Sequence, residues 1–254
     1  MTDLPGVLSD ALSPELFLAL SFIVLSLVEH FHPNRRYASN PIWFRHLFWL
    51  QLGGIVLTSA VGWIITDTYQ HLTLFPRIQA LFVNSPAVIN GLVAYLVVTF
   101  INYWWHRFRH DSDLLWRLFH QIHHSTHRLQ TATALYSHPL DYAGTIFIVN
   151  VVAYGLFGFD AQSAAWATAW VGIFELWEHT NIRTPHWLGY LIVRPEMHRI
   201  HHELDRHKNN YAIPLWDALF GTYENPRREV DCGFAHEREQ RLKDMLRFKD
   251  VHKA

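Results

Sequence analysis

The stretch GLVAYLVVTFINYWWHRFRHDSDLLWRLFHQIHH, residues 91–124, joins a long apolar run to closely spaced histidines. The apolar part belongs to residues 78–105, which lie between Arg77 and His106 and contain no charged side chain. A helix needs roughly 20 apolar residues to cross a bilayer, so this segment is long enough, and we expect the helix to begin near Pro86. A histidine-rich region therefore starts where a predicted membrane helix ends.

Other apolar segments predict further membrane helices. Residues 47–66 carry no charged side chain, and residues 16–28 form a shorter apolar run. Residues 142–159 and 161–177 form an apolar pair interrupted at Asp160, which indicates a helical hairpin, although a hairpin buried in a soluble domain would show the same pattern. The ends of these segments carry aromatic residues that favour the interface between membrane and water, namely Trp104, Trp105, Tyr142 and Trp177.

The basic residues indicate an orientation. With the N-terminus outside, Arg35, Arg36 and Arg45 lie inside, and only Arg77 of the 21 Lys and Arg residues faces outside. Because cytoplasmic loops carry the excess of Lys and Arg, the histidine-rich region is predicted to be cytoplasmic and the N-terminus to lie on the opposite side.

The sequence thus predicts an all-α fold, an integral membrane helical bundle with four to five membrane segments and a cytoplasmic helical cap that carries the histidines. We expect three regions along the chain. Residues 1–105 form the N-terminal spans, 106–223 the histidine-box region including the hairpin 142–177, and 224–254 a charged C-terminal tail with a solvated surface.

Composition excludes several classes of protein. The 254 residues carry a formal net charge of −1, so no global basic field favours nucleic acid as a partner. The single cysteine, Cys232, excludes an internal disulfide framework and a cysteine-based zinc site.

The histidines recur at spacings that suit metal binding. His106 and His110 are four residues apart and share one face of a helix, although two interfacial histidines would show the same spacing. Asp111, Ser112 and Asp113 predict the start of a regular helix that extends to His127 and contains HQIHH, residues 120–124, in which His120 and His124 are also four apart. The neighbours His123 and His124 diverge by about 100° around a helix, so they can address two different metal ions.

A second copy of the pattern, HRIHH, occupies residues 198–202, after Pro195 and Glu196, which suit a helix start. His179 ends the hairpin and can close the cluster from the membrane side, or serve as an interfacial histidine. Imidazoles without thiolates suit iron, copper or zinc. Nearby acidic residues are placed to accept hydrogen bonds from the outer imidazole nitrogens, although solvated loop charges would show the same placement: Asp111, Asp113, Glu178, Glu196, Glu203 and Asp205.

Taken together, these motifs resemble the fatty acid hydroxylase/sterol desaturase superfamily of membrane di-iron enzymes. The resemblance runs through HRFRH (106–110), LWRLFHQIHHS (115–125) and SHPLD (137–141), then HTN (179–181), HRIHH (198–202) and NY to WDALFGTY (210–223). It covers about half of the chain. Ala212 departs from the glycine that many members have after Asn-Tyr, which puts only the local turn in doubt.

The resemblance implies O2-dependent oxidation of a lipid C–H bond by two iron ions, which zinc can replace during purification. It implies nine catalytic, metal-ligating histidines: His106, His110, His120, His123, His124, His179, His198, His201 and His202. We expect His138, Asn181, Trp216 and Asp217 next to the ligands or in the substrate pocket. His127 matches no motif position and is left out. The resemblance also implies an external electron donor, either a protein or a reduced pterin.

The sequence leaves alternatives open. A sterol, a fatty acyl chain or an ether lipid would suit the site, and hydroxylation and desaturation are not distinguished. The electron donor and the oligomeric state also stay open. The principal alternative is a membrane metal-binding transporter without redox catalysis, but transporters place ionisable ligands within their spans, and the two clearest spans here carry no charge.

Overall fold

Among the residues that the structure describes, four helices are long and apolar enough to cross a membrane. A computed structural model describes residues 13–69, 74–236 and 238–253 of the chain. Helices α2 (Pro14–Phe31), α3 (Pro41–Tyr69) and α5 (Ala87–Asp111) are long and apolar enough to cross a membrane, as is α8 (Pro139–Asn150) with its π-helical continuation η3 (Val151–Leu156). The predicted all-α membrane bundle is confirmed.

Capping residues and prolines explain where these helices begin. The Ser13 hydroxyl accepts a hydrogen bond from the backbone N–H of Leu16 at the start of α2 (3.2 Å). Pro86 precedes α5 and separates it from the short helix α4 (Pro76–Phe82). Asp160 caps α9 (Ala161–Glu178), and this break produces the predicted helical hairpin.

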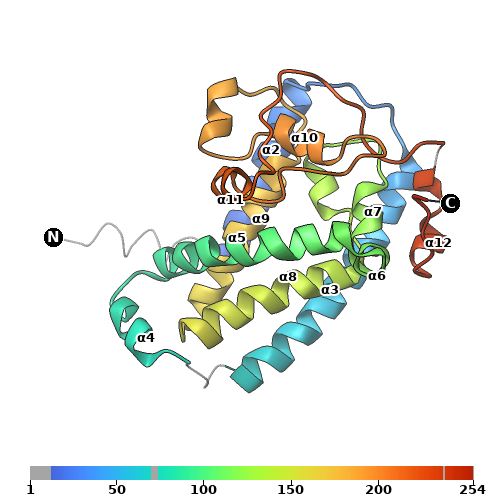
Figure 1. Ribbon diagram of the computed structural model, residues 1–254. Coiled ribbons are helices and arrows are strands. Elements are labelled where there is room, and N and C mark those ends of the chain that lie inside the picture. Colours follow the sequence, from blue (N-terminus) through green and yellow to red (C-terminus); the bar gives the residue numbers. More distant parts are fainter. Residues whose placement is uncertain (1–12, 70–73, 237, 254) are drawn as a thin grey trace.

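The helices pack in pairs. Helix α5 packs against α9, α3 against α8, and α2 against α9 (Figure 1). Gly91 permits the close approach of α5 to α9, because a Cβ atom there would lie 2.5 Å from the Cβ of Trp166. Helices α2 and α3 turn large apolar side chains outward, as expected for helices in contact with lipid.

A cap of short helices covers one end of the bundle (Figure 1). Apart from a single bridge between Glu203 and Cys232, the described residues form no β-structure. The cap consists of α6 (Asp113–Leu115), η1 (Trp116–His120), α7 (Gln121–His124), η2 (Thr131–Leu135), η4 (His186–Tyr190), α10 (Pro195–His201), α11 (Pro214–Leu219), η5 (Arg238–Gln240) and α12 (Leu242–Met245).

Two expectations for the cap need correction. The segment after Ser112 is not one regular α-helix, because η1 is a π-helical turn and the helix ends at His124. His127 therefore lies outside this helix, exposed to solvent. The C-terminal segment is not simply a solvated tail, since Leu242 and Met245 are buried in the apolar core of the cap.

Candidate metal centre

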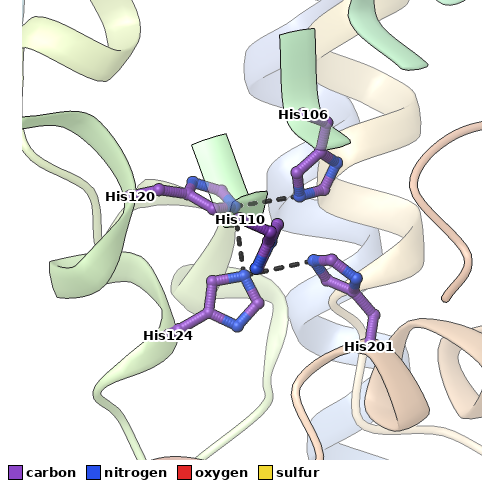
Figure 2. A group of neighbouring side chains, drawn as sticks. All are labelled: His106, His110, His120, His124 and His201. Atoms are coloured by element: carbon purple, nitrogen blue, oxygen red, sulfur yellow. Dashed lines mark hydrogen bonds between the residues drawn. The ribbon is translucent and has the colours of Figure 1, made fainter. Parts of the chain in front are cut away.

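The C-terminal turns of α5 carry His106 and His110 out of the apolar bundle and into the cap. Five histidines meet there, and their ligand-capable nitrogens lie within 4.8 Å of one another (Figure 2). We call them group one: His106, His110, His120, His124 and His201. The Nε2 atom of His120 lies 2.9 Å from that of His106 and 3.0 Å from that of His124.

Four further histidines form group two, again within 4.8 Å of one another: His123, His179, His198 and His202. Nε2 of His179 lies 3.1 Å from Nε2 of His123 and 3.0 Å from Nε2 of His198. The two groups are adjacent, because the rings of His124 and His202 stack with centroids 4.1 Å apart. All nine predicted histidines are thus brought together.

Neighbours in the sequence belong to different groups. His123 and His124 are separated in this way, and so are His201 and His202. The rotation of about 100° per helical residue explains both separations. Each H-x-x-H-H motif therefore contributes side chains to both groups.

The hydrogen bonds of the outer nitrogens define which ring nitrogens face inward as acceptors. Nδ1 of His106 donates to the carbonyl oxygen of Tyr211 (2.8 Å), and Nδ1 of His201 donates to that of Asn209 (2.7 Å). Because a carbonyl only accepts, the single proton of each neutral ring sits on Nδ1, and Nε2 keeps a lone pair. His179 has the same arrangement with the carbonyl of Glu175 (2.7 Å).

These inward lone pairs fit metal ions. Nε2 of His106 and of His179 each lie about 3 Å from another imidazole nitrogen, a contact that a cation between the rings would stabilise. Nε2 of His110 is buried without any hydrogen-bond partner. Burial also lowers the pKa of His201 to about 3 and that of His179 to about 4, which keeps both rings in the neutral, metal-binding form.

A loop between α10 and α11 supplies the carbonyls that orient His106 and His201. Its backbone has positive φ at His207 (45°), Asn209 (70°) and Asn210 (49°), which turns the carbonyls toward the imidazoles. Asp217 fastens the end of the loop, because its carboxylate accepts hydrogen bonds from the backbone N–H groups of Tyr211 (2.8 Å) and Ala212 (3.0 Å).

The other three residues expected near the ligands have different contacts. Nδ1 of His138 accepts a hydrogen bond from the N–H of Leu140 and caps α8 (3.1 Å). Asn181 is tied by its side chain to the backbone of Arg35. Nε1 of Trp216 donates to the hydroxyl of Thr99, which docks α11 on α5 (2.9 Å).

Two residues next to group one were not predicted. The carboxylate of Asp141 on α8 lies 3.1 Å from Nδ1 of His120 and pairs with the guanidinium of Arg109. Asp141 is the only acidic residue of the apolar helix α8–η3, a signal that the sequence does contain. Nδ1 of buried His207 lies 3.1 Å from Nδ1 of His124, and no motif position marks His207.

Carboxylates are also present beside group two. Glu175 and Glu178 place oxygens within 4.8 Å of each other and of a ring nitrogen of His179. Glu178 also lies 3.4 Å from Nδ1 of His198. Of the six acidic neighbours considered from the sequence, Glu196 binds Thr184 and Arg194 instead.

A cavity of about 690 Å³ reaches both groups from among the membrane helices. Its walls include His106 and His120 of group one and His123 and His198 of group two. The remaining wall is mostly apolar and comes from α2, α3, α5, α8 and α9, with Trp177 at the end of α9, and from residues in the segments 134–137, 191–193 and 211–213 of the cap. The volume lies in the range of about 300–1,000 Å³ that is usual for ligand sites.

Comparison with known proteins agrees with this geometry. Residues 91–222, just over half of the chain, match the model of the fatty acid hydroxylase family. Human alkylglycerol monooxygenase is 31% identical over 152 residues, which cover 56% of this chain and 32% of that protein. An ornithine lipid hydroxylase of Rhizobium tropici is 31% identical over 192 residues, which cover 70% and 56% of the two chains.

A very-long-chain aldehyde decarbonylase of Oryza sativa subsp. indica is 27% identical over 170 residues, covering 61% of this chain and 64% of the relative. The chain therefore spans from about a third to just under two thirds of the length of these relatives. No solved structure gives a significant match. The matched region contains all nine histidines of the two groups, and the chain belongs to the fatty acid hydroxylase family.

Proposed function

We propose that this protein is a membrane lipid hydroxylase that holds two iron ions, one in each histidine group. The observation that carries the proposal is the cavity, which connects two buried histidine groups to a space among apolar membrane helices. Relatives named as monooxygenase and hydroxylase favour hydroxylation over desaturation. The substrate we propose is a lipid with an acyl or alkyl chain, including fatty acyl, ether-lipid and sterol classes.

The bound metal supplies O2-dependent oxidation of an unactivated C–H bond. The residues of this chain prepare the site for that chemistry. The carbonyls of Asn209 and Tyr211 hold the protons of His201 and His106 on Nδ1, and Asp141 orients His120. The apolar cavity wall excludes water and receives the lipid chain.

We further propose that electrons come from a separate donor protein or a reduced pterin. The distribution of Lys and Arg supports a cytoplasmic cap, on which a donor from the cytoplasm would act. A transporter is less consistent with the geometry, because the histidines lie at the C-terminal ends of α5 and α9 and in the short helices of the cap, away from the middle of the spans.

Lipidomics of cells with and without the gene tests this function. We expect a lipid that gains one oxygen atom, with the label present when cells grow under ¹⁸O2. His127→Ala serves as a matched control, since His127 lies outside both groups, whereas His198→Ala should abolish the product. Metal flux through proteoliposomes without any modified lipid would instead support the transporter.

A further inference from the structure

Two short helices of the cap expose large apolar side chains on their outer side. On η4 and just after it, Trp187 is 60% exposed, Tyr190 66% and Leu191 68%. On α11, Leu215 is 60% exposed and Leu219 66%. The two helices are linked by a hydrogen bond from the hydroxyl of Tyr223, just after α11, to the carbonyl of Gly189 on η4. Soluble proteins rarely expose this much large apolar side chain in one part of their surface, which indicates a contact. We call these five residues the apolar cap surface.

Charge is absent from the apolar cap surface. Residues 186–193 contain no Asp, Glu, Lys or Arg. Residues 213–222 contain a single acid, Asp217, which is buried and bonded to the loop backbone. The opposite side of the cap differs, because α12 and the residues after it carry Lys243, Arg247 and Lys249 (Figure 1).

The surface continues the outward face of a membrane helix. Trp216 of α11 packs against Phe100 of α5 with ring centroids 5.1 Å apart, and Phe220 packs against Trp104 at 4.9 Å. Phe100 itself is 39% exposed on α5, which is long and apolar enough to span a membrane. Helix α11 is therefore fixed against the part of α5 that faces outward.

Helix η4 is held by its own contacts. The hydroxyl of Tyr223 donates to the carbonyl of Gly189 (3.0 Å), and the side-chain amide of Asn225 donates to the carbonyl of His186 (3.0 Å). These bonds fix the backbone of η4, while the side chains of Trp187 and Tyr190 remain exposed at the surface of the chain. Trp and Tyr are the residues that prefer the interface of a bilayer.

We propose that η4 and α11 lie in the interfacial layer of the bilayer, with the apolar cap surface in contact with lipid. Helices that present an apolar face with aromatic residues lie in the interfacial plane of a bilayer with that face toward the lipid chains. The cap is then partly submerged and does not stand above the membrane. Leu191 and Ile213, which border the two helices and line the cavity, come to lie at the level of the lipid chains.

Fluorescence quenching in nanodiscs tests the proposal on the full chain. The variants Leu215→Cys and Leu219→Cys carry an NBD label, and Leu246→Cys is the matched control on the charged side of the cap, where Leu246 is 41% exposed. Native Cys232 does not interfere, because it is buried and burial raises the pKa of its thiol to about 11. Nitroxide-labelled lipid is the quencher in the bilayer, and iodide is the quencher in water.

We expect nitroxide lipid to quench the labels at positions 215 and 219 strongly and iodide to quench them weakly, with the reverse order at position 246. Iodide quenching at 215 and 219 equal to that at 246 would overturn the proposal. The labels could also be protected from both quenchers, with this protection lost in nanodiscs that hold one copy of the chain. That result would overturn the proposal too, because a second copy of the chain would then cover the surface. The readout needs neither metal nor activity, so it is independent of the proposed function.

Discussion

Oδ2 of Asp141 lies 3.1 Å from Nδ1 of His120, and the same carboxylate pairs with the buried guanidinium of Arg109. A carboxylate that receives the outer N–H of a ligand histidine orients the ring and raises its basicity. Losing such a partner typically lowers metal affinity about 10- to 100-fold. We therefore expect Asp141→Asn to weaken metal binding at group one by that factor, as measured by competition with a chelator.

Asp113→Asn provides the control for this prediction. Asp113 is an exposed acid that pairs with Lys253 at the start of α6, away from both groups. Its variant should bind metal as the wild type does. Equal metal affinity in Asp141→Asn and the wild type would show that the carboxylate does not support His120.

His207 should orient His124 in a similar way. With Nε2 of His124 turned toward group one, its Nδ1 donates to Nδ1 of His207 at 3.1 Å. We expect His207→Ala to lower the metal content of the purified protein, and His207→Gln to restore part of it by offering an acceptor oxygen. His252→Ala, whose ring lies 5.0 Å from that of His207 between centroids, should leave the metal content unchanged.

The N-cap of helix α8 makes the stability of the folded chain depend on pH. Nδ1 of His138 accepts the N–H of Leu140, and burial lowers the pKa of His138 from 6.5 to about 4. As the pH falls, the unfolded chain binds this proton before the folded chain does. The contribution of His138 to the free energy of unfolding is therefore present above pH 6.5 and is lost as the pH falls toward 4. The melting temperature of His138→Asn in detergent should fall less than that of the wild type over this range.

Asparagine keeps a side-chain acceptor at the N-cap position. The variant and the wild type therefore differ in whether this residue binds a proton and not in whether it caps the helix. His127→Asn, at an exposed position, should leave the pH dependence of the wild type intact. Parallel curves for His138→Asn and the wild type would contradict the assignment.

Close packing of α5 against α9 depends on Gly91. A Cβ atom at this position would lie 2.7 Å from the backbone nitrogen of Ala167, a contact that requires backbone movement. Overpacking of this kind costs about 1–3 kcal/mol, so Gly91→Ala should lower the melting temperature. At Gly62 of α3 an added Cβ meets nothing within 4 Å, and Gly62→Ala should not be destabilised.

Periodic features of this protein could be predicted from the sequence. The long segments without charged residues predicted the membrane helices. Pro86 and Asp160 predicted helix boundaries, because a proline and a capping aspartate each act within one helical turn. The rotation between His123 and His124 is also local, so their separation into two groups followed from the helical wheel. The same reasoning did not anticipate the π-helical turn Trp116–His120, since no period in the sequence marks it.

Contacts between distant segments could not be predicted. Asp141 meets His120 because α8 packs beside η1, and the helical wheel of either segment alone does not show that contact. His207 reaches His124 through a loop with positive φ angles, which has no repeating pattern to read. His138 illustrates the opposite case, where a motif residue caps a helix and lies outside both histidine groups.

The central claim is that the two histidine groups are two metal sites. Metal analysis of the purified chain, expressed with iron and compared with variants of one member of each group, tests it most directly. We predict close to two metal ions per wild-type chain. The count should fall toward one in His202→Ala, which belongs to the four-membered group two, and should stay at two in the control His127→Ala. A wild-type chain that binds a single metal ion, or a count that His202→Ala leaves unchanged, would contradict the account.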